Sequence, residues 1–342
     1  MAHNTLKYWG GAKLGEGSKG IVYDLNCKKD EESFCKIIEG WSDDISGLAL
    51  YSKDGKHKLE PAHILAFIKY ISNKKNRIVK ILKDRKYMSV TMKTAKGKRT
   101  LKRSIDDEIH SNMKILTKFG EKGDRYLSIN PHLVFENIEF IACTISFKNN
   151  IKPATHVIFG QKCNTGKTDL DKLLIDILES IDYMSKFEIN HKDIKSDNIM
   201  MCEGKYKLID WGNATFKDDI RGGLFAGPLK YYLSGSTEEK ALEKLPEKLK
   251  RKCPDIYNSE LFKAIYSKIE SEFTKLAEKK AGYLHANYKG NNDLFALGIT
   301  IIEIVIRDHL KEEKYLELIQ MLTSYINPVT PESALNYVKN TF

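Results

Sequence analysis

The feature that most constrains this chain is a run of polar residues, His-Lys-Asp-Ile-Lys-Ser-Asp-Asn at positions 191–198, followed twelve positions after Asn198 by Asp210-Trp-Gly. Short strands predicted at 199–201 and 206–209, joined by a Glu-Gly turn, would bring both ends of this segment to one edge. That edge would carry two carboxylates, a lysine and a carboxamide. Phosphoryl transfer uses such groups, because a carboxylate orients the attacking hydroxyl, a cation neutralises the phosphate and oxygen ligands hold Mg²⁺.

Near the start of the chain, Gly15, Gly17 and Gly20 form a G-x-G-x-x-G pattern. A dinucleotide-binding loop with this pattern would lead into a helix, but residues 21–25 and 34–38 alternate like strands. Glycines have no Cβ, so the backbone amides of such a loop can approach phosphates closely. We therefore expect a glycine-rich nucleotide flap between two strands.

These motifs and their order resemble eukaryotic-type protein kinases. Residues 191–198 resemble the kinase catalytic loop, His-Arg-Asp-x-x-x-x-Asn, with Lys192 in place of Arg, and Asp210-Trp-Gly resembles Asp-Phe-Gly with Trp in place of Phe. A helix predicted over 104–119 resembles the kinase αC helix. The apolar helix predicted to open on Asp293 resembles the start of αF. The resemblance covers roughly residues 12–38 and 104–306 and indicates a divergent, viral- or effector-like member of the Ser/Thr kinase superfamily.

The resemblance assigns roles to the catalytic loop. It implies that Asp193 is the catalytic base or the carboxylate that orients the hydroxyl, and that Lys195 neutralises the transferred γ-phosphate. Asn198 and Asp210 would hold Mg²⁺, and His191 would pack the loop against Asp210. A lysine two positions after the aspartate is the pattern of Ser/Thr kinases. The implied enzyme is therefore a protein serine/threonine kinase that uses ATP and Mg²⁺ and phosphorylates Ser or Thr of a protein substrate.

The residues expected to contact ATP belong to the flap, to a lysine-bearing strand or to the helix over 104–119. They are Gly15, Glu16, Gly17, Gly20, Val22, Lys36 and Glu108. Glu108 would face the nucleotide-site lysine, for which three residues compete. Lys36 follows the flap within a hairpin's length, Lys93 ends a Val-Thr-Met-Lys run that is similar to the kinase Val-Ala-Ile-Lys, and Lys80 is the third. We expect Lys36 to be the nucleotide-site lysine, because a strand contiguous with the flap defines the position of its lysine better than similarity to a motif does.

The fold implied is α+β and two-lobed, like that of protein kinases. Residues 1–160 would form an N-lobe with an antiparallel sheet, and residues 161–342 a mainly helical C-lobe. A basic insert at about 41–104, in which 77–82 and 87–92 alternate like a hairpin, departs from a compact kinase lobe. A charged helical segment at about 237–280 also departs from it. Residues 227–232 resemble the end of an activation segment, but no Ala-Pro-Glu follows, so we expect a trimmed or rewired C-lobe.

Charge is concentrated in residues 51–103, which carry 17 Lys or Arg against 3 acidic residues, whereas the net charge of the whole chain is +10. A local excess of this size favours an acidic partner, either nucleic acid or an acidic protein. Residues 93–103 also resemble a nuclear localisation signal.

Several features indicate an intracellular protein, either cytoplasmic or nuclear. The chain has no run of 18 apolar residues, so no membrane span is expected. Its first residues lack the apolar core of a classical signal peptide. Its 6 cysteines include no Cys-x-x-Cys pair, which predicts free thiols.

Two other functions compete with a protein kinase. Ile-Asp-Trp at 209–211 resembles a motif of aminoglycoside and choline kinases, which phosphorylate small molecules. Those enzymes usually carry His or Pro-rich sequence after the catalytic aspartate, where this chain has Ile-Lys-Ser. A pseudokinase scaffold would be expected to have lost Asp193, Asn198 or Asp210, and all three are present.

Overall fold

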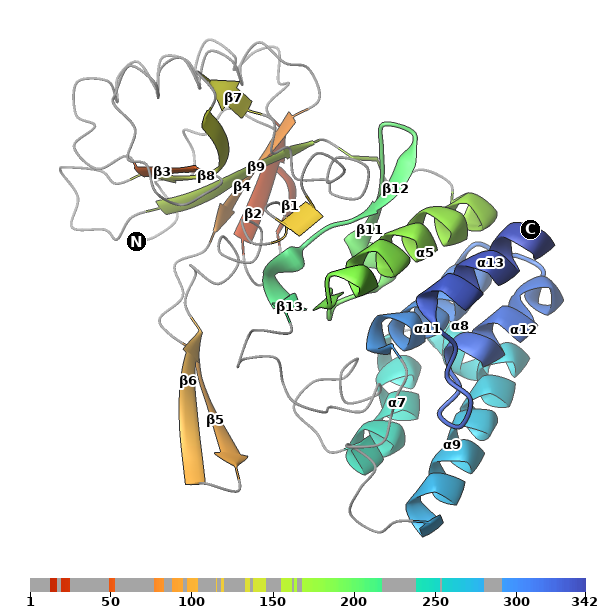
Figure 1. The fold of residues 1–342 in the computed structure, drawn as a ribbon. Helices are drawn as coiled ribbons and strands as arrows, with labels where there is room; N and C mark the ends of the chain where they lie inside the picture. The colour runs from red at the N-terminus through yellow and green to blue at the C-terminus, as the bar shows by residue number, and fades with distance from the viewer. Residues whose placement is uncertain are drawn as a thin grey trace. The chain divides into compact units, whose positions relative to one another are not determined.

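The computed structural model describes residues 13–16, 20–24, 49–52, 77–82, 88–94, 97–103, 115, 118–119, 133–135, 138–145, 155–161, 163–164, 168–216, 238–252, 254–279 and 291–342. The chain divides into two compact units, Met1–Asn164 and Thr165–Phe342. Figure 1 shows antiparallel strands in the first unit and mainly helices in the second, so helix and strand content are both substantial.

The first unit is built on an antiparallel sheet whose strands follow the order β1-β2-β4-β9-β8-β3, with β7 also paired to β8. These strands are β1 (Lys13–Glu16), β2 (Gly20–Asp24), β3 (Ala49–Ser52), β4 (Arg77–Leu82), β7 (Leu133–Phe135), β8 (Ile138–Ile145) and β9 (Thr155–Gln161). Strand β4 is rich in β-branched residues and lies between β2 and β9, in the interior of the sheet. Residues 34–38, the expected partner of the flap, lie outside the described residues.

The hairpin predicted between residues 77–82 and 87–92 is wrong. β4 pairs with β2 and β9, whereas β5 (Met88–Thr94) pairs with β6 (Gly97–Arg103) in a two-stranded sheet of its own. Alternation along a strand determines which residues share a face, but it does not select the partner strand. The β5–β6 register places Lys93 opposite Lys98, within the basic segment, and an acidic partner for that segment stays a prediction.

The second unit is mainly helical, with short strands around the catalytic loop. Its helices are α5 (Leu170–Lys186), α7 (Glu238–Lys252), α8 (Pro254–Asn258), α9 (Glu260–Lys279), α11 (Asn292–Arg307), α12 (Glu312–Leu322) and α13 (Pro331–Thr341). Its strands are β10 (Ile189–Asn190), β11 (Ile199–Cys202), β12 (Lys205–Leu208) and β13 (Thr215–Phe216). Of the helix predicted over 104–119, in the first unit, the structure describes 115, 118 and 119, which are helical.

Helix α11 is central to the core of this unit. Every residue from Asp293 to Ile302 is buried, and so are Ile304 and Val305, as expected for a helix that is apolar on nearly all sides. Gly298 permits a close approach to α12, because a Cβ there would lie 2.7 Å from Thr323 Cγ2 and 3.1 Å from Leu322 Cβ. The helix is therefore held rigidly, and it provides a firm support for whatever packs along it.

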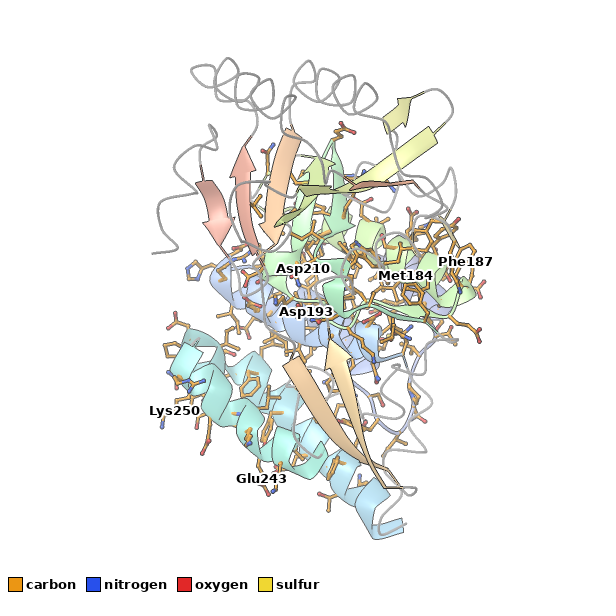
Figure 2. All side chains as sticks on the ribbon, turned by 90° about the vertical axis from the view of Figure 1, so that its left-hand side faces the viewer. Met184, Phe187, Asp193, Asp210, Glu243 and Lys250 are labelled. Carbon is orange, nitrogen blue, oxygen red and sulfur yellow. The ribbon has the colours of Figure 1, made fainter. Side chains whose placement is uncertain are left out.

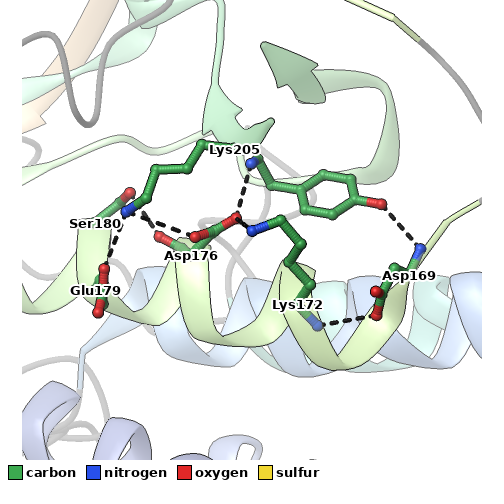
Figure 3. A network of polar contacts seen from close by, with 7 residues as sticks. Asp169, Lys172, Asp176, Glu179, Ser180 and Lys205 are labelled. Carbon is green, nitrogen blue, oxygen red and sulfur yellow. Dashed lines mark hydrogen bonds and ion pairs between the residues drawn. The ribbon is translucent and has the colours of Figure 1, made fainter. Parts of the chain in front are cut away.

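Helix α5 is joined to the β11–β12 hairpin by a polar network (Figure 3). The Asp169 side chain caps the helix by accepting a hydrogen bond from Lys172 N–H, and the Tyr206 hydroxyl accepts one from Asp169 N–H. The buried Asp176 carboxylate accepts a 2.9 Å bond from Tyr206 N–H and forms an ion pair with Lys205. These bonds fix the hairpin, which bears both ends of the catalytic segment, on the helix.

Helix α7 contains Pro246, which has no N–H to donate to the carbonyl four residues earlier. That carbonyl belongs to Leu242, and it accepts a hydrogen bond of 3.2 Å from the Tyr266 hydroxyl on α9. A partner from another helix thus replaces the missing intrahelical bond and joins α7 to α9. This segment, 237–280, was predicted to be helical, and α7, α8 and α9 occupy most of it.

Two further expectations can be compared with the structure. Among the helices that the structure describes, none is long and apolar enough to cross a membrane. The expectation of free thiols is wrong for Cys163 and Cys202, which are both disulfide-bonded. Proximity in the fold determines which cysteines can be bridged, and the spacing of cysteines along the sequence does not report it.

Candidate active site

Asn198 and Asp210 flank the open end of the β11–β12 hairpin. Ile199 pairs with Leu208, and the next hydrogen bond, from Ile209 N–H to the carbonyl of Asn198, measures 2.9 Å. Asn198 therefore lies directly beside the residue that precedes Asp210. The strands predicted from sequence at 199–201 and 206–209 are confirmed, and they place the two predicted metal ligands at one edge.

Within the loop, Asp193 is bonded to two of the other candidate site residues, Lys195 and Asn198. Lys195 Nζ lies 3.2 Å and 3.1 Å from the two carboxylate oxygens of Asp193, and Asn198 Nδ2 donates a 2.8 Å bond to the Asp193 carbonyl. The Asp193 side chain is 25% exposed and that of Lys195 is 39% exposed. Both can therefore reach a substrate while the loop is held in one conformation.

The donor set at this edge suits a hard cation. Because Asn198 uses its amide N–H for the bond to Asp193, its carboxamide oxygen is left to act as a ligand, and Asp210 adds a carboxylate. Such oxygens are the ligands that Mg²⁺ prefers, usually together with water and phosphate oxygens. Within the described residues no group of three or more His, Cys, Asp or Glu forms a metal cage. A metal here would need further ligands from a nucleotide or water.

Asp210 adopts a left-handed backbone conformation, with φ 62° and ψ 60°. Lys192 does the same with φ 65°. Among non-glycine residues Asp tolerates this region comparatively well, whereas a lysine there is unusual. Backbone strain of this kind persists only where surrounding contacts impose it, and it is frequent at functional sites. Figure 2 labels Asp193 and Asp210, and both carboxylates act electrostatically on His191.

His191 is fully buried and connects the loop to the Asp-Trp-Gly segment. Its Nδ1 accepts a hydrogen bond from Asp193 N–H at 3.3 Å, so its Nε2–H donates to the Ile209 carbonyl at 3.0 Å. The ring of Trp211 packs edge-on against the imidazole, with 4.6 Å between the ring centroids, and the indole N–H donates a hydrogen bond to the Leu208 carbonyl. His191 thus packs the loop against Ile209 and Trp211, the two neighbours of Asp210 in the chain.

Burial lowers the pKa of His191 below its ordinary value of 6.5, and the charges of Asp293, Asp193 and Asp210 and the bond to the Ile209 carbonyl oppose that shift only in part. Below pH 6.5 the unfolded chain therefore binds a proton at this residue that the folded chain does not. We expect the free energy of unfolding to fall as the pH drops below about 6.5, by at most about 1.4 kcal/mol per pH unit from this group.

Urea unfolding at several pH values would measure this dependence. His191→Gln, which keeps a neutral donor and acceptor, should remove this contribution to the slope. His309→Asn, at an exposed position, should leave the slope as in the parent. Equal slopes for the parent and His191→Gln would contradict a neutral, buried His191.

Helix α11 anchors the loop through a residue whose role the sequence analysis did not assign. The carboxylate of Asp293, which is 0% exposed, accepts hydrogen bonds from His191 N–H at 2.7 Å and from Lys192 N–H at 3.0 Å. The Thr300 hydroxyl lies 2.8 Å from the Ala296 carbonyl and 3.4 Å from that of Ile194. The likeness of this helix start to kinase αF was the signal in the sequence that could have identified Asp293.

In the first unit, the strand register aligns several of the residues that were considered as ATP contacts. Gly15 lies opposite Val22, Val22 opposite Lys80, and Lys80 opposite Ile158, so one row crosses β1, β2, β4 and β9. Directly opposed residues share a face of an antiparallel sheet. Of the other predicted ATP contacts, Glu16 pairs with Ile21 and Gly20 with Leu82.

Gly17, Lys36 and Glu108 lie outside the described residues. Lys80 lies on β4, which pairs with flap strand β2, whereas Lys93 belongs to the separate β5–β6 sheet. The argument that favoured Lys36, a strand adjoining the flap, therefore applies to Lys80 among the residues that the structure describes.

No family model matches the chain. Among solved structures, the chain is similar to the crystal structure of the PF14_0431 kinase domain, with 14% sequence identity and a TM-score of 0.42. The similarity covers 94% of this chain and 92% of that chain. The function proposed below rests on the geometry of the catalytic loop.

Proposed function

We propose that this chain is an ATP-dependent Ser/Thr protein kinase that transfers the γ-phosphate of Mg-ATP to hydroxyl groups of proteins. The observation that carries the proposal is the arrangement around Asp193. Its carboxylate is bonded to Lys195 Nζ at 3.1 Å and 3.2 Å, and its carbonyl is bonded to Asn198 at 2.8 Å. A carboxylate for the hydroxyl, a cation for the phosphate and an amide oxygen for the metal are thus held in one loop.

The chemistry follows from these positions. The partly exposed Asp193 carboxylate can accept a hydrogen bond from a substrate hydroxyl, orient its oxygen and take up its proton as the new P–O bond forms. Lys195 is placed to neutralise the phosphoryl oxygens. Asn198 and Asp210 would hold Mg²⁺ through oxygen ligands. Mg-ATP would supply the γ-phosphoryl group, with ADP as the leaving group, so the protein's own contribution is positioning and charge.

We assign the nucleotide lysine to Lys80 in place of Lys36. Lys80 lies opposite Val22, and Val22 lies opposite the flap residue Gly15, so the three residues form one row across the sheet. Lys80→Met should lower kcat/KM for ATP by about 10²-fold or more, as expected when a charge on the phosphates is lost. Lys36→Met and Lys93→Met remove the same charge and should change kcat/KM by less than about threefold. Initial rates at varied ATP, with thermal melts to verify folding, would decide among the three. The largest loss at Lys36 would restore the original assignment.

The direct test of function is incubation of the purified chain with γ-labelled ATP, Mg²⁺ and a mixed panel of proteins and small alcohols, including an aminoglycoside and choline. Label on Ser or Thr of a protein, including the chain itself, is the expected result. Label found only on a small alcohol would replace the proposal by a small-molecule phosphotransferase, the candidate favoured by Ile-Asp-Trp at 209–211. Nucleotide binding with no transfer to any acceptor would instead indicate a pseudokinase scaffold.

A further inference from the structure

The side chain of Ser196 is held by a glutamate that the proposed chemistry does not use. Ser196 Oγ donates a hydrogen bond of 2.6 Å to Glu303 Oε1, and the two residues are 107 positions apart in the chain. A bond from a hydroxyl to a carboxylate is charge-assisted, and 2.6 Å falls within the short range typical of such bonds. Ser196 follows Lys195 directly, so this bond acts on the part of the loop that bears the proposed phosphate cation.

Helix α11 meets the loop at successive points. Asp293 holds the N–H groups of His191 and Lys192, the Thr300 hydroxyl lies near the carbonyl of Ile194, and Glu303 holds Ser196. At about 100° and 1.5 Å per residue, positions 293, 300 and 303 fall within roughly 80° of one another around the helix and span about 15 Å along it. The loop therefore runs along one side of a buried, rigid helix, and Glu303 provides the last of these contacts.

A neighbouring positive charge acts on Glu303. Arg307 lies one turn further along α11, and its pKa is raised above its ordinary value, mainly by its hydrogen bond to Asp308, with a smaller contribution from the charge of Glu303. Arg307 Nη2 also donates to the Thr168 hydroxyl at 3.2 Å, just before α5. The carboxylate that receives Ser196 thus lies in the electrostatic field of a guanidinium that is bonded to Asp308 and Thr168.

We infer that Glu303 is a positioning residue for the reaction, because its bond to Ser196 fixes the turn that runs from Lys195 to Asn198. The turn is closed by a 2.9 Å bond from Asn198 N–H to the Lys195 carbonyl, so a shift of Ser196 would displace the proposed phosphate cation and the proposed metal ligand together. The inference rests on the proposed function, but the conformation of the turn can be measured without it.

Kinetics provide the first arm of the test. Ser196→Ala and Glu303→Ala should each lower kcat by about 10- to 100-fold, the range expected when a catalytic group is displaced slightly, with the KM for ATP within about twofold. The double variant should be no slower than either single variant, because both changes remove the same bond. Glu303→Gln keeps an acceptor oxygen for Ser196 and should stay within about threefold of the parent. Glu313→Ala, at an exposed position of α12, removes the same charge and should change nothing.

Hydrogen exchange provides the second arm. A peptide that spans 194–199 should exchange faster in Ser196→Ala and Glu303→Ala than in the parent, Glu303→Gln and Glu313→Ala, while peptides from α5 stay unchanged. A kcat within twofold of the parent in Ser196→Ala, or losses that add in the double variant, would overturn the inference and leave the kinase proposal standing. If the parent transfers no phosphate, the proposed function fails, and unchanged exchange over 194–199 would then overturn the positioning role as well.

Discussion

Asp193→Asn is expected to lower kcat by about 10²- to 10⁴-fold, the range that general acid–base groups contribute, while the dissociation constant for Mg-ATP changes by less than about threefold. Asn has nearly the same shape and keeps an oxygen for Lys195, which lies 3.1 Å and 3.2 Å from the carboxylate oxygens in the parent. It cannot accept the proton of a substrate hydroxyl. Chemistry should therefore fail while the loop keeps its conformation.

Single-turnover rates and calorimetry with Mg-ATP would separate these two effects. Asp255→Asn makes the same change at an exposed position on α8 and should match the parent in both measurements. A kcat for Asp193→Asn within about fivefold of the parent would remove Asp193 from the mechanism. A loss of Mg-ATP affinity as large as the loss of kcat would instead mean that the substitution disturbs Asn198, the proposed metal ligand, which is bonded to the Asp193 carbonyl.

The elements that the sequence predicts well are long, periodic or clearly capped. Apolar residues recur at helical spacing over 170–187, where the structure has the helix Leu170–Lys186, and the apolar helix predicted to open on Asp293 is Asn292–Arg307, with Asn291 as its N-cap. Helix α5 has apolar residues at helical spacing, α11 is a long and nearly continuous apolar run, and a capping residue marks the start of each. The β11–β12 hairpin is equally local, since a four-residue strand, a turn and a second strand leave little choice of partner. Most of the catalytic segment therefore follows from local pattern.

The partners of β4 show where local pattern is insufficient. Its alternation identifies a strand, but its neighbours in the sheet are β2 and β9, which lie more than 50 positions before it and more than 70 after it. Residues 87–92 are nearer in sequence and have a similar pattern, so they were the expected partner. Pairing over long separations depends on the whole sheet, and no short window of sequence contains that information. The choice among Lys36, Lys80 and Lys93 depended on that pairing.

The sequence gives little indication, for a similar reason, of the two α11 residues that hold the loop. Asp293 and Glu303 are ordinary acidic residues in the sequence, and one lies at a helix start where an aspartate is expected in any case. Their roles depend on hydrogen bonds to His191 and Ser196, which are more than 100 positions away in the chain. The loop could be identified from its motif and Asp293 from the likeness of its helix to αF, whereas the contact of Glu303 with Ser196 is visible only in the structure.

Asp293→Asn should therefore lower the stability of the protein clearly, although the two side chains have nearly the same shape. Each oxygen of the buried Asp293 carboxylate accepts one backbone N–H, from His191 at 2.7 Å and from Lys192 at 3.0 Å. An asparagine offers one acceptor oxygen and places an amide N–H against the other donor. A buried N–H without a partner costs about 1–3 kcal/mol, so we expect the free energy of unfolding to fall by that amount. Asp293→Ala, which removes both acceptors, should lose more.

The matched control is Asp182→Asn on α5, because Asp182 pairs with Lys186, whose side chain is 63% exposed. An ion pair with a solvated lysine is worth about 0–1 kcal/mol, so this variant should unfold close to the parent in urea. In Asp293→Asn the amides of His191 and Lys192 should also exchange faster, and phosphate transfer should slow, because the left-handed backbone of Lys192 loses the contact that imposes it. If Asp293→Asn unfolds within about 0.5 kcal/mol of Asp182→Asn, the two N–H groups do not depend on the carboxylate, and the conformation of the loop must be imposed by the packing of His191 against Trp211 instead.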